Sequence, residues 1–230
     1  MDAFADVEFL DRAVLVEDTL VLADLHLGKV AASTVQLPVG EGTAMVDRLR
    51  ELCADVSLEA VVVAGDLLHS FESVPRLVED SLAGLLQVAD DYDIDLVVTP
   101  GNHDTMLEAV WAGETTPEYR VGDTLVCHGH VEPAGSADRY VVGHDHPTIS
   151  LEGTRRPCFL AGEGCYEGAD VLVLPAFNRL LAGVEVNEMS AADFMSPLVR
   201  DADALAPVVS EGVDGEPLVF PPLGTLRHKL

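Results

Sequence analysis

Residues 19–29 read TLVLADLHLGK, in which an apolar run ends abruptly at Asp24 and His26. Aliphatic and β-branched residues over 19–23 are typical of a buried strand. Polar side chains that directly follow such a strand lie at its carboxyl end, where open α/β sheets build their binding and catalytic sites. The segment therefore predicts one strand of a sheet and the beginning of a functional site.

Four more segments repeat this arrangement further along the chain. Gly65 and Asp66 follow the run VVVA, and GNHD at 101–104 follows LVVTP. HGH at 128–130 follows TLVC, and GHDH at 143–146 follows YVV. Any one of these pieces is more often turn chemistry or an ordinary packing residue. Five of them in order, each at the end of a predicted strand, instead predict that they meet in one site.

The remaining periodicity favours an α/β fold with two sheets. Helical spacing of apolar residues predicts helices over Glu41–Cys53 and Val74–Ala89. The strands that we expect are Ala13–Val16, Thr19–Ala23, Ala60–Ala64, Asp95–Thr99, Thr124–Cys127, Arg139–Val142, Cys158–Ala161 and Val171–Leu174. A layered sandwich accommodates the alternating first half and the strand-rich second half in a single domain, 1–230. Residues 196–230 contain several Pro and Gly, and we expect them to wrap around that domain.

Composition narrows the class of protein. Apolar residues make up 48% of the 230, which is enough for a folded core and argues against intrinsic disorder. The 13 Lys and Arg against 40 Asp and Glu give a net charge of −27, which does not support a basic nucleic-acid-binding module. Only Lys29 and Lys229 are lysines, and an acid excess with so few lysines indicates a halophilic protein from a cytosol of very high salt.

The sequence also predicts a cytoplasmic protein. Its four cysteines, Cys53, Cys127, Cys158 and Cys165, form no CxxC pair, which favours a reducing compartment. Acidic residues throughout the first eleven positions argue against a signal peptide. No uninterrupted apolar run reaches the ~18 residues of a membrane span, so we expect no membrane partner.

The donor set at the predicted strand ends is that of a dinuclear metal centre. It contains two aspartates, one asparagine and four histidines, and imidazole mixed with carboxylate suits Mn, Fe, Co, Ni or Zn. In such centres one carboxylate bridges two ions about 3.5–4 Å apart, and the two ions clamp a phosphoryl group. Gly65, Gly101 and Gly143 precede ligands at the strand exits, where a missing Cβ allows unusual φ and ψ angles and a close approach of the backbone to the metals.

Together, DLH, GD, GNHD, HGH and GHDH, in this order within residues 19–148, resemble the five-block signature of the calcineurin-like metallophosphoesterases. The stretches DLHLGK, GDLLH, GHDHP, CFL and LPAFN further resemble the archaeal ICC-like phosphoesterases, which are related to the DNA-ligase-associated ones. The resemblance implies a four-layer αββα sandwich of two mixed sheets flanked by helices. It also implies two divalent transition-metal ions as cofactors, with Mn²⁺ the first choice.

By the same resemblance, each block carries an expected role. The metal ligands would be Asp24, His26 and His146 for the first ion and Asn102, His128 and His144 for the second, with Asp66 bridging both. His103 would be the catalytic histidine, held in orientation and kept protonated by Asp104. The implied reaction is in-line attack on a phosphate ester by a metal-bridging hydroxide, while protonated His103 steadies the transferred charge or protonates the departing alkoxide.

Five further residues lie close to these blocks in the sequence. Lys29, His69 and His130 are candidates for contacts with the substrate. Arg139, at the start of the strand before GHDH, is expected in a surface ion pair. Asp145 stands between two ligands, and alternation is expected to point it away from the metals.

Three functions are compatible with this site. The first is a phosphodiesterase or phosphatase that acts on nucleotides, and the second is a DNA or RNA repair nuclease associated with a ligase or helicase. No long basic groove is visible, so the nuclease ranks second, although high salt weakens that objection. The third is a catalytically weak scaffold, which the presence of every ligand position argues against. The native metal, the exact nucleotide or nucleic-acid substrate and the oligomeric state stay open, with a homodimer among the options.

The net charge predicts how stability responds to salt. Repulsion within the excess of 27 negative charges is screened as the Debye length falls from about 10 Å at 0.1 M salt to about 3 Å at 1 M. The melting temperature, followed by circular dichroism, should therefore rise with KCl over this range. A chelator should lower it most at low salt, because bound ions stabilise the folded state. A melting temperature that stays flat or falls with KCl contradicts the halophilic interpretation and leaves the metal-site prediction intact.

Overall fold

The computed structural model describes residues 2–29, 40–69, 74–210, 212 and 215–227. Its first sheet has six strands in chain order, β1 Val7–Leu10, β2 Ala13–Val16, β3 Thr19–Leu22, β4 Ala60–Val63, β5 Asp95–Val98 and β6 Glu114–Thr115. The strands β1, β2 and β3 are antiparallel neighbours, whereas β3 to β6 run parallel. The strands β3 and β4 are buried along their whole length, as their uninterrupted aliphatic sequences predict.

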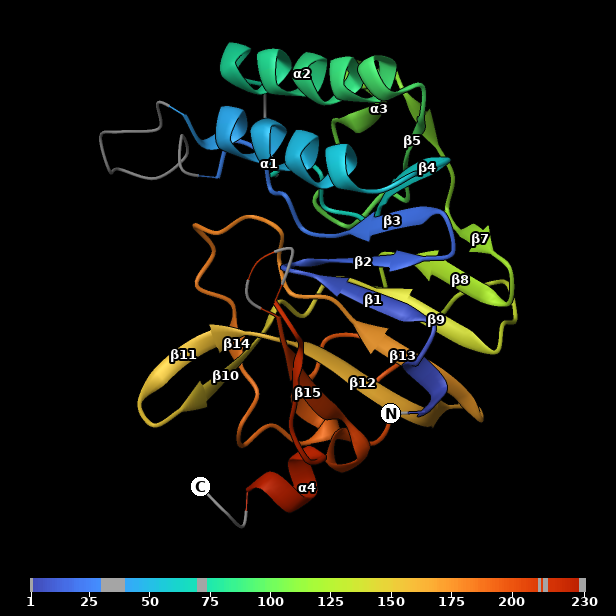
Figure 1. The fold of residues 1–230 in the computed structure, drawn as a ribbon, viewed down its shortest axis with the longest axis vertical. Coiled ribbons are helices and arrows are strands. Elements are labelled where there is room, and N and C mark those ends of the chain that lie inside the picture. The colour runs from blue at the N-terminus through green and yellow to red at the C-terminus, as the bar shows by residue number, and fades with distance from the viewer. Residues whose placement is uncertain (1, 30–39, 70–73, 211, 213–214, 228–230) are drawn as a thin grey trace.

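The second sheet has seven strands in the order β16-β15-β12-β13-β9-β8-β7. In chain order they are β7 Tyr119–Val121, β8 Thr124–Cys127, β9 Arg139–Val142, β12 Phe159–Tyr166, β13 Ala169–Val173, β15 Ala206–Val209 and β16 Leu218–Val219. The strands β8, β9 and β13 run parallel. A third, smaller sheet is formed by β10 Pro147–Leu151, β11 Thr154–Pro157 and β14 Val184–Glu185 (Figure 1).

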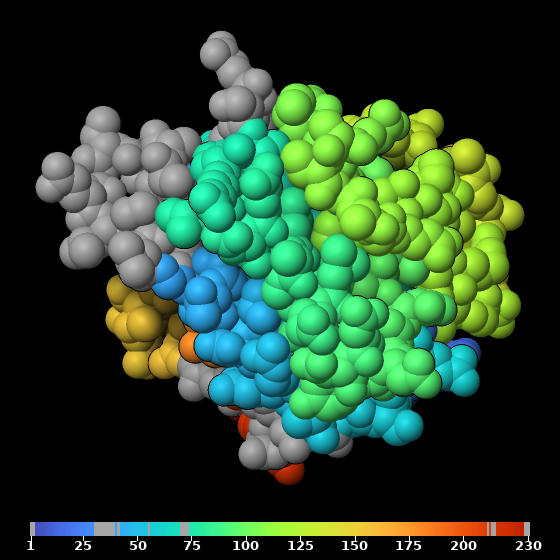
Figure 2. Space-filling view, turned by 90° about the horizontal axis from the view of Figure 1, so that it is seen from above, coloured from blue at the N-terminus to red at the C-terminus, as the bar shows by residue number. Residues whose placement is uncertain are grey.

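Helices cover the outer faces of the two large sheets. The long helices α1 Glu41–Asp55 and α2 Arg76–Tyr92 lie side by side over the first sheet, together with the one-turn α3 Leu107–Val110 (Figures 1 and 2). In the described part of the chain the second sheet is covered by short elements, the 3₁₀ helices Ala191–Asp193 and Ala202–Ala204 and the four-residue α4 Leu223–Leu226. A further 3₁₀ helix, Asp2–Phe4, precedes β1. The expected αββα sandwich is confirmed, with a thin fourth layer.

Three apolar layers hold these elements together. The first packs the helices on the first sheet through residues such as Leu49 and Leu85. The second lies between the sheets, where Phe9 and Phe159 meet edge to face with ring centroids 5.0 Å apart. The third joins the second sheet to the C-terminal segment through residues such as Leu198. Close packing on both faces fixes the two sheets relative to each other.

Strand registers align the carboxyl ends of the parallel strands at one edge of each sheet. In the first sheet the aligned terminal residues are Leu22, Val63 and Val98. In the second sheet they are Cys127, Val142 and Val173. A bond between the two edges, from the backbone N–H of His144 to Asp24 Oδ2 (3.0 Å), shows that these edges meet. The segments that follow the strands are therefore brought together.

The predicted elements are present; half of their ends agree with prediction, and all the others but one lie within three residues of it. The largest difference is the strand expected over Cys158–Ala161, which continues as β12 to Tyr166 because its second half pairs with β13 after a bulge. The sequence did not predict β1, β6, β7, β10, β11, β14, β15 or β16. These strands are short, and several contain Pro or charged residues that weaken the strand signal.

The C-terminal segment is part of the second sheet and its core. Strand β15 pairs with β12, and Leu205, Leu223 and Leu226 are buried beneath that sheet. These contacts support our proposal that the chain forms one domain over 1–230. All four cysteines are free and buried. None of the described helices is long and apolar enough to cross a membrane.

Candidate metal centre

The loops that follow the strands hold their ligand candidates in a rare backbone conformation. Positive φ angles occur at Asp24 (58°), His26 (43°), Asp66 (49°), His144 (76°) and His146 (48°). Residues with a side chain seldom adopt this left-handed region, so the surrounding structure must supply the free energy that it costs. Such strain at five of the seven ligands predicted from the sequence is typical of a functional site.

Four side chains from both sheets converge on one point. His128 Nδ1 lies 3.1 Å from the carbonyl oxygen of Ala64, and this contact turns its Nε2 toward the other donors. That Nε2 lies 3.1 Å from Asn102 Oδ1, 3.1 Å from His144 Nδ1 and 3.5 Å from Asp66 Oδ2. The loops after β4, β5, β8 and β9 thus contribute one donor each to a first cluster.

A second cluster of donors lies beside the first. His146 Nε2 is 3.1 Å from Asp24 Oδ1 and 3.3 Å from His26 Nε2. Asp24 is completely buried, at 0% exposure. A carboxylate removed from water in this way requires a positive partner or hydrogen-bond donors. The neighbouring imidazoles or a cation held with them can fill that role.

Asp66 stands between the two clusters. Its Oδ2 lies 3.5 Å from His26 Nε2 in one cluster and 3.5 Å from His128 Nε2 in the other. Its Oδ1 accepts the backbone N–H of His103 at 2.9 Å, which fixes the orientation of the carboxylate. A carboxylate oxygen equally distant from two donor clusters is placed to bridge two cations.

The spacing and chemistry of both clusters fit divalent transition metals. Ligand atoms that bind a metal at about 2.0–2.2 Å stand roughly 3.0–3.5 Å from one another at octahedral or tetrahedral angles. The distances of 3.1 to 3.5 Å within the clusters fall in this range. Two groups of three side chains bring their donor atoms within 4.8 Å of one another, namely Asp24, His26 and His146, and Asp66, His128 and His144.

Burial favours the neutral, metal-binding form of most of the imidazoles, whereas at His146 burial is outweighed by the charge and hydrogen bond of Asp24, which raise the pKa. Burial lowers the pKa of His26 to about 3. Burial, assisted by the charge of His128, lowers the pKa of His144 to about 4. Burial also raises the pKa of Asp66 to about 6, and the charge of Asp24 acts in the same direction. Metals bind neutral imidazole and ionised carboxylate. A bound cation would therefore lower the pKa of Asp66 and favour the neutral form of the histidines.

Glycines let these side chains approach the backbone. At Gly65, φ is 77° and a Cβ would lie 2.3 Å from His128 Nδ1. At Gly101 a Cβ would lie 2.2 Å from Asp66 Oδ1, and φ is not in the left-handed region. Gly143 likewise has no positive φ and is packed against Asp24. A positive φ therefore occurs at Gly65 alone of these three glycines, and at all three a Cβ would collide with neighbouring atoms of the site.

Asp104 connects two of the loops that carry donors. Its Oδ2 accepts the backbone N–H groups of Gly101 (2.9 Å) and Leu67 (3.3 Å), and its Oδ1 accepts that of Leu68 (2.8 Å). The buried carboxylate therefore fastens its own loop, after β5, to the loop after β4. The catalytic role of His103 and the orienting role of Asp104 toward its ring stay predictions.

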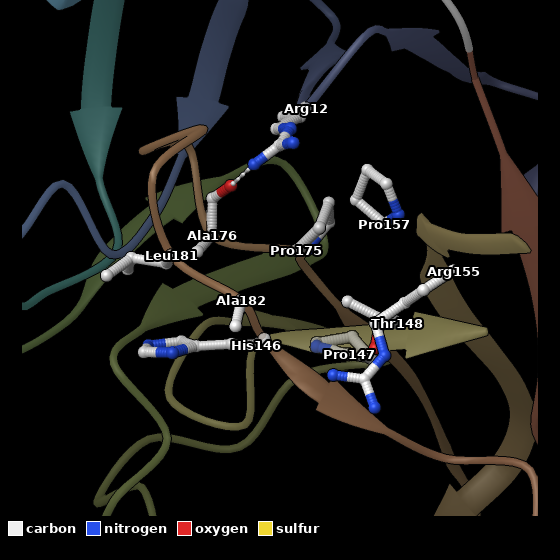
Figure 3. Close-up of a pocket in the computed structure, with 11 residues that line it drawn as sticks. Arg12, His146, Pro147, Thr148, Arg155, Pro157, Pro175, Ala176, Leu181 and Ala182 are labelled. Atoms are coloured by element: carbon white, nitrogen blue, oxygen red, sulfur yellow. Dashed lines mark hydrogen bonds between the residues drawn. The ribbon is translucent and has the colours of Figure 1, made fainter. Parts of the chain in front are cut away.

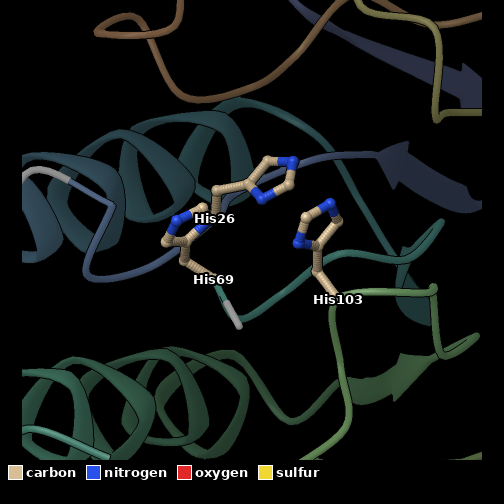
Figure 4. A group of neighbouring side chains, drawn as sticks. All are labelled: His26, His69 and His103. Carbon is tan, nitrogen blue, oxygen red and sulfur yellow. The ribbon is translucent and has the colours of Figure 1, made fainter. Parts of the chain in front are cut away.

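Two of the predicted substrate contacts lie on the side of the second cluster. His26, His69 and His103 gather there (Figure 4), with the rings of His69 and His103 stacked at 5.6 Å and an angle of 13° between their planes. Burial lowers the pKa of His69, and the nearby charge of the exposed Lys29 lowers it further. Lys29 and His69 thus share one neighbourhood.

The third predicted substrate contact, His130, lies on the side of the first cluster. Its ring centroid is 5.1 Å from that of His128 and 6.1 Å from that of His144. Lys29, His69 and His130 therefore flank the two clusters from opposite sides, and their contact with substrate stays a prediction.

Asp145 and Arg139 behave as the sequence predicts. Asp145 turns away from its ligand neighbours and accepts the backbone N–H groups of Met195 (2.8 Å) and Ser196 (3.2 Å). Arg139 forms an ion pair with Asp6 at 2.8 Å. Asp145 thereby anchors the GHDH loop to the C-terminal segment.

Sequence reasoning missed Asn178, which positions the strand end that carries Asp24. Its Nδ2 donates to the carbonyl of Leu25 at 2.9 Å, while the N–H of the preceding Phe177 donates to the carbonyl of Ala23 at 2.8 Å. A signal was present, because Asn178 follows the strand β13 just as the ligands follow theirs.

The bonds of Asp104 predict the effect of removing its charge. The amide of Asp104→Asn has one acceptor oxygen, so at least one of the three N–H groups loses its partner and faces another donor. We expect a loss of about 1–3 kcal/mol in the free energy of unfolding, measured by urea denaturation with a chelator present. Mn²⁺ affinity, measured by calorimetry, should fall roughly 10- to 100-fold.

A matched control for Asp104→Asn is Asp90→Asn, because Asp90 is exposed on α2. The free energy of unfolding of the control should stay within about 0.5 kcal/mol of that of the parent protein. If the two variants unfold alike, the carboxylate of Asp104 does not fasten the loops.

Comparison with known proteins agrees with this geometry. Residues 18–171, which include every predicted ligand, match the family model of the calcineurin-like phosphoesterases. The structure also resembles the crystal structure of Pseudomonas putida nuclease MPE, with a TM-score of 0.61 and 24% sequence identity over 92% of this chain and 94% of that chain. That likeness shows a shared fold, and neither match singles out the archaeal branch. The chain belongs to the calcineurin-like phosphoesterase family, and it is a metal-binding hydrolase that acts on phosphate esters.

Proposed function

We propose that this protein hydrolyses phosphodiester or phosphomonoester bonds of nucleotide-type substrates at a dinuclear metal centre. The observation that carries the proposal is the position of Asp66 Oδ2, 3.5 Å from a histidine nitrogen of each donor cluster. Two cations that share this oxygen would stand close enough to hold one phosphoryl group between them. The family match supports the reaction class.

Each ion would be held by side chains that follow strands of both sheets. Asp24, His26 and His146 would hold one ion, and Asn102, His128 and His144 the other, with Asp66 shared. Carboxylate and amide oxygens beside imidazole favour Mn²⁺, and Fe, Ni, Co or Zn can take the same donors. When bound, the ions supply a nucleophile at neutral pH and neutralise the charge of the phosphoryl oxygens.

The protein itself supplies a proton donor beside the metals. The backbone N–H of His103 donates a hydrogen bond to Asp66 Oδ1 at 2.9 Å. The side chain of His103 therefore begins close to the carboxylate that would bridge the two ions. The His103 ring stands 5.0 Å from that of His26, centroid to centroid. In this position His103 can donate a proton to the alkoxide that leaves when the P–O bond breaks. Lys29, His69 and His130 surround the place where the rest of the substrate would lie.

A nuclease is the second candidate function. The solved structure that this chain resembles is that of a nuclease, and the match covers 92% of this chain. The complete set of donors in the structure weighs against a scaffold without catalysis. A nuclease and a nucleotide phosphodiesterase both hydrolyse a phosphodiester bond. They differ in how much of the nucleic-acid strand they bind beyond the scissile phosphate.

The central test is hydrolysis of bis-p-nitrophenyl phosphate with Mn²⁺, compared between the parent protein and Asp66→Asn. We expect turnover by the parent, and loss of most bound metal and nearly all turnover in the variant, because neither ion keeps its shared ligand. Elemental analysis measures the metal and absorbance measures the nitrophenol. The control variant Asp90→Asn, at an exposed position, should keep both the bound metal and the turnover of the parent protein. Two metals per chain in Asp66→Asn would refute the bridging role.

A second variant separates proton transfer from metal binding. His103→Asn should lower turnover roughly 10²–10⁴-fold, the range for a lost general acid. Its metal content should stay near that of the parent, because His103 is no ligand in this assignment. The loss should be larger for methyl esters, whose alkoxide needs the proton, than for nitrophenyl esters. Loss of metal in this variant would make His103 a ligand instead.

A further inference from the structure

A small pocket adjoins the metal centre on the side of His146. Its volume is about 150 Å³. In Figure 3 Arg12 lies at the top of the lining and Arg155 at its right, while the ring of His146 lies at the left and points away from both arginines. Among the described residues that line the pocket, His146 alone is also a predicted metal ligand or substrate contact. The pocket is thus a neighbour of the centre and has its own residues.

The hairpin of β1 and β2 places Arg12 at this position. The strand β2 runs antiparallel to β3 with Val14 opposite Val21, so the turn before β2 lies beside the end of β3, next to Asp24. Arg12 Nη1 donates to the carbonyls of Ala176 (3.0 Å) and Asn178 (3.1 Å). These two bonds fix the guanidinium and leave its other nitrogens without a protein partner in the described residues.

No carboxylate among the described residues pairs with Arg12. Its neighbour Asp11 instead pairs with Arg48 and with Arg179, the latter at 2.8 Å. Burial and the charge of Arg179 lower the pKa of Arg12 to about 10, so it is still protonated at neutral pH. Arg12, Arg48 and Arg179 lie near two carboxylates, those of Asp11 and Glu51, and so make a local excess of positive charge in a chain whose net charge is −27. Such a spot attracts an anion.

The opposite wall adds two groups that suit the same ligand. Arg155 pairs with Glu185 at 3.0 Å, and both side chains are about half exposed, so this surface pair can be exchanged at little cost. Thr148 is 5% exposed, and its Oγ1 has no hydrogen-bond partner in the described residues. A buried hydroxyl without a partner costs free energy that an oxygen-rich ligand can recover.

The pocket and the metal centre are close enough for one substrate to reach both. Thr148 comes two residues after His146, so their Cα atoms are at most about 7 Å apart. A group bound in the pocket therefore lies next to a phosphate bound at the metals. Pro147, Pro157 and Pro175 complete the wall with apolar faces against which the sugar between two phosphates can pack.

We propose that this pocket binds the phosphate group next to the scissile one in a nucleic-acid strand, with Arg12 as its main contact. Arginine matches phosphate because its planar fork donates two hydrogen bonds to two oxygens. The inference rests on the proposed function and narrows its substrate class to oligonucleotides. A substrate with a single phosphate leaves the pocket empty.

The test compares a ten-residue deoxythymidine oligonucleotide with bis-p-nitrophenyl phosphate, which has one phosphate. Arg12→Gln should raise KM for the oligonucleotide roughly 10- to 100-fold, as expected when a hydrogen bond to a charged group is removed. The variant should keep kcat, and its kcat/KM for bis-p-nitrophenyl phosphate should stay within about twofold. The slope of log KM against log salt should become shallower by about 0.7, because the variant neutralises one phosphate fewer on a single strand.

A second variant and a control separate binding from folding. Ala182→Phe fills the pocket from its exposed rim and leaves the bonds of Arg12 to the carbonyls intact, so it should reproduce the selective rise in KM. Arg200→Gln is the control, because Arg200 pairs with Glu132 and Glu167 on the exposed surface and is absent from the pocket lining. Its KM for the oligonucleotide and its kcat/KM for bis-p-nitrophenyl phosphate should equal those of the parent protein.

The outcomes distinguish the subsite from the proposed function. An equal effect of Arg12→Gln on both substrates makes Arg12 structural, and an unchanged KM for the oligonucleotide rejects the subsite. If the parent protein hydrolyses neither substrate, the proposed function fails. The subsite is then judged by fluorescence anisotropy of the labelled oligonucleotide with Mn²⁺. That affinity should fall roughly 10- to 100-fold in Arg12→Gln, and an equal affinity rejects the subsite.

Discussion

The carboxylate of Asp66 links the two halves of the fold. One of its oxygens lies 3.5 Å from His26 Nε2, on the first sheet, and 3.5 Å from His128 Nε2, on the second. Its other oxygen accepts the N–H of His103. Because each of these groups begins at the end of a different strand, the carboxylate holds its place only while the strand ends of both sheets stay in register. The metal centre is therefore a property of the whole sandwich.

Several costly features of the molecule are explained by this centre. Five of the ligand candidates hold a positive φ, and Asp24 and Asp66 are removed from water at 0% and 1% exposure. A cation shared between carboxylates and neutral imidazoles recovers the cost of burying those charges. The surrounding layers of apolar residues provide the rigidity that keeps the strained loops in place. Asp104 and Asn178 add hydrogen bonds from one loop to the next.

Much of this arrangement can be predicted from the sequence, for a physical reason. Strands such as 60–63 are buried on both faces and are uninterrupted runs of aliphatic residues, so both their position and the polar residue after them stand out. The strands β10 and β11 contain Pro, Thr and Arg and lie on a small sheet, so no such pattern marks them. Arg12 gave no signal either, since its place beside the centre depends on its bonds to the carbonyls of Ala176 and Asn178, which are far away in the sequence. Long-range contacts of this kind are not encoded in any local pattern of residues.

Crystals grown with Mn²⁺ and measured at the manganese absorption edge test the central claim most directly. The account predicts two anomalous peaks per chain about 3.5–4 Å apart, with one oxygen of Asp66 in contact with both. His26 and His146 should contact one peak, and His128 and His144 the other. A single peak, or two peaks that do not share Asp66, would contradict the dinuclear centre on which the account rests.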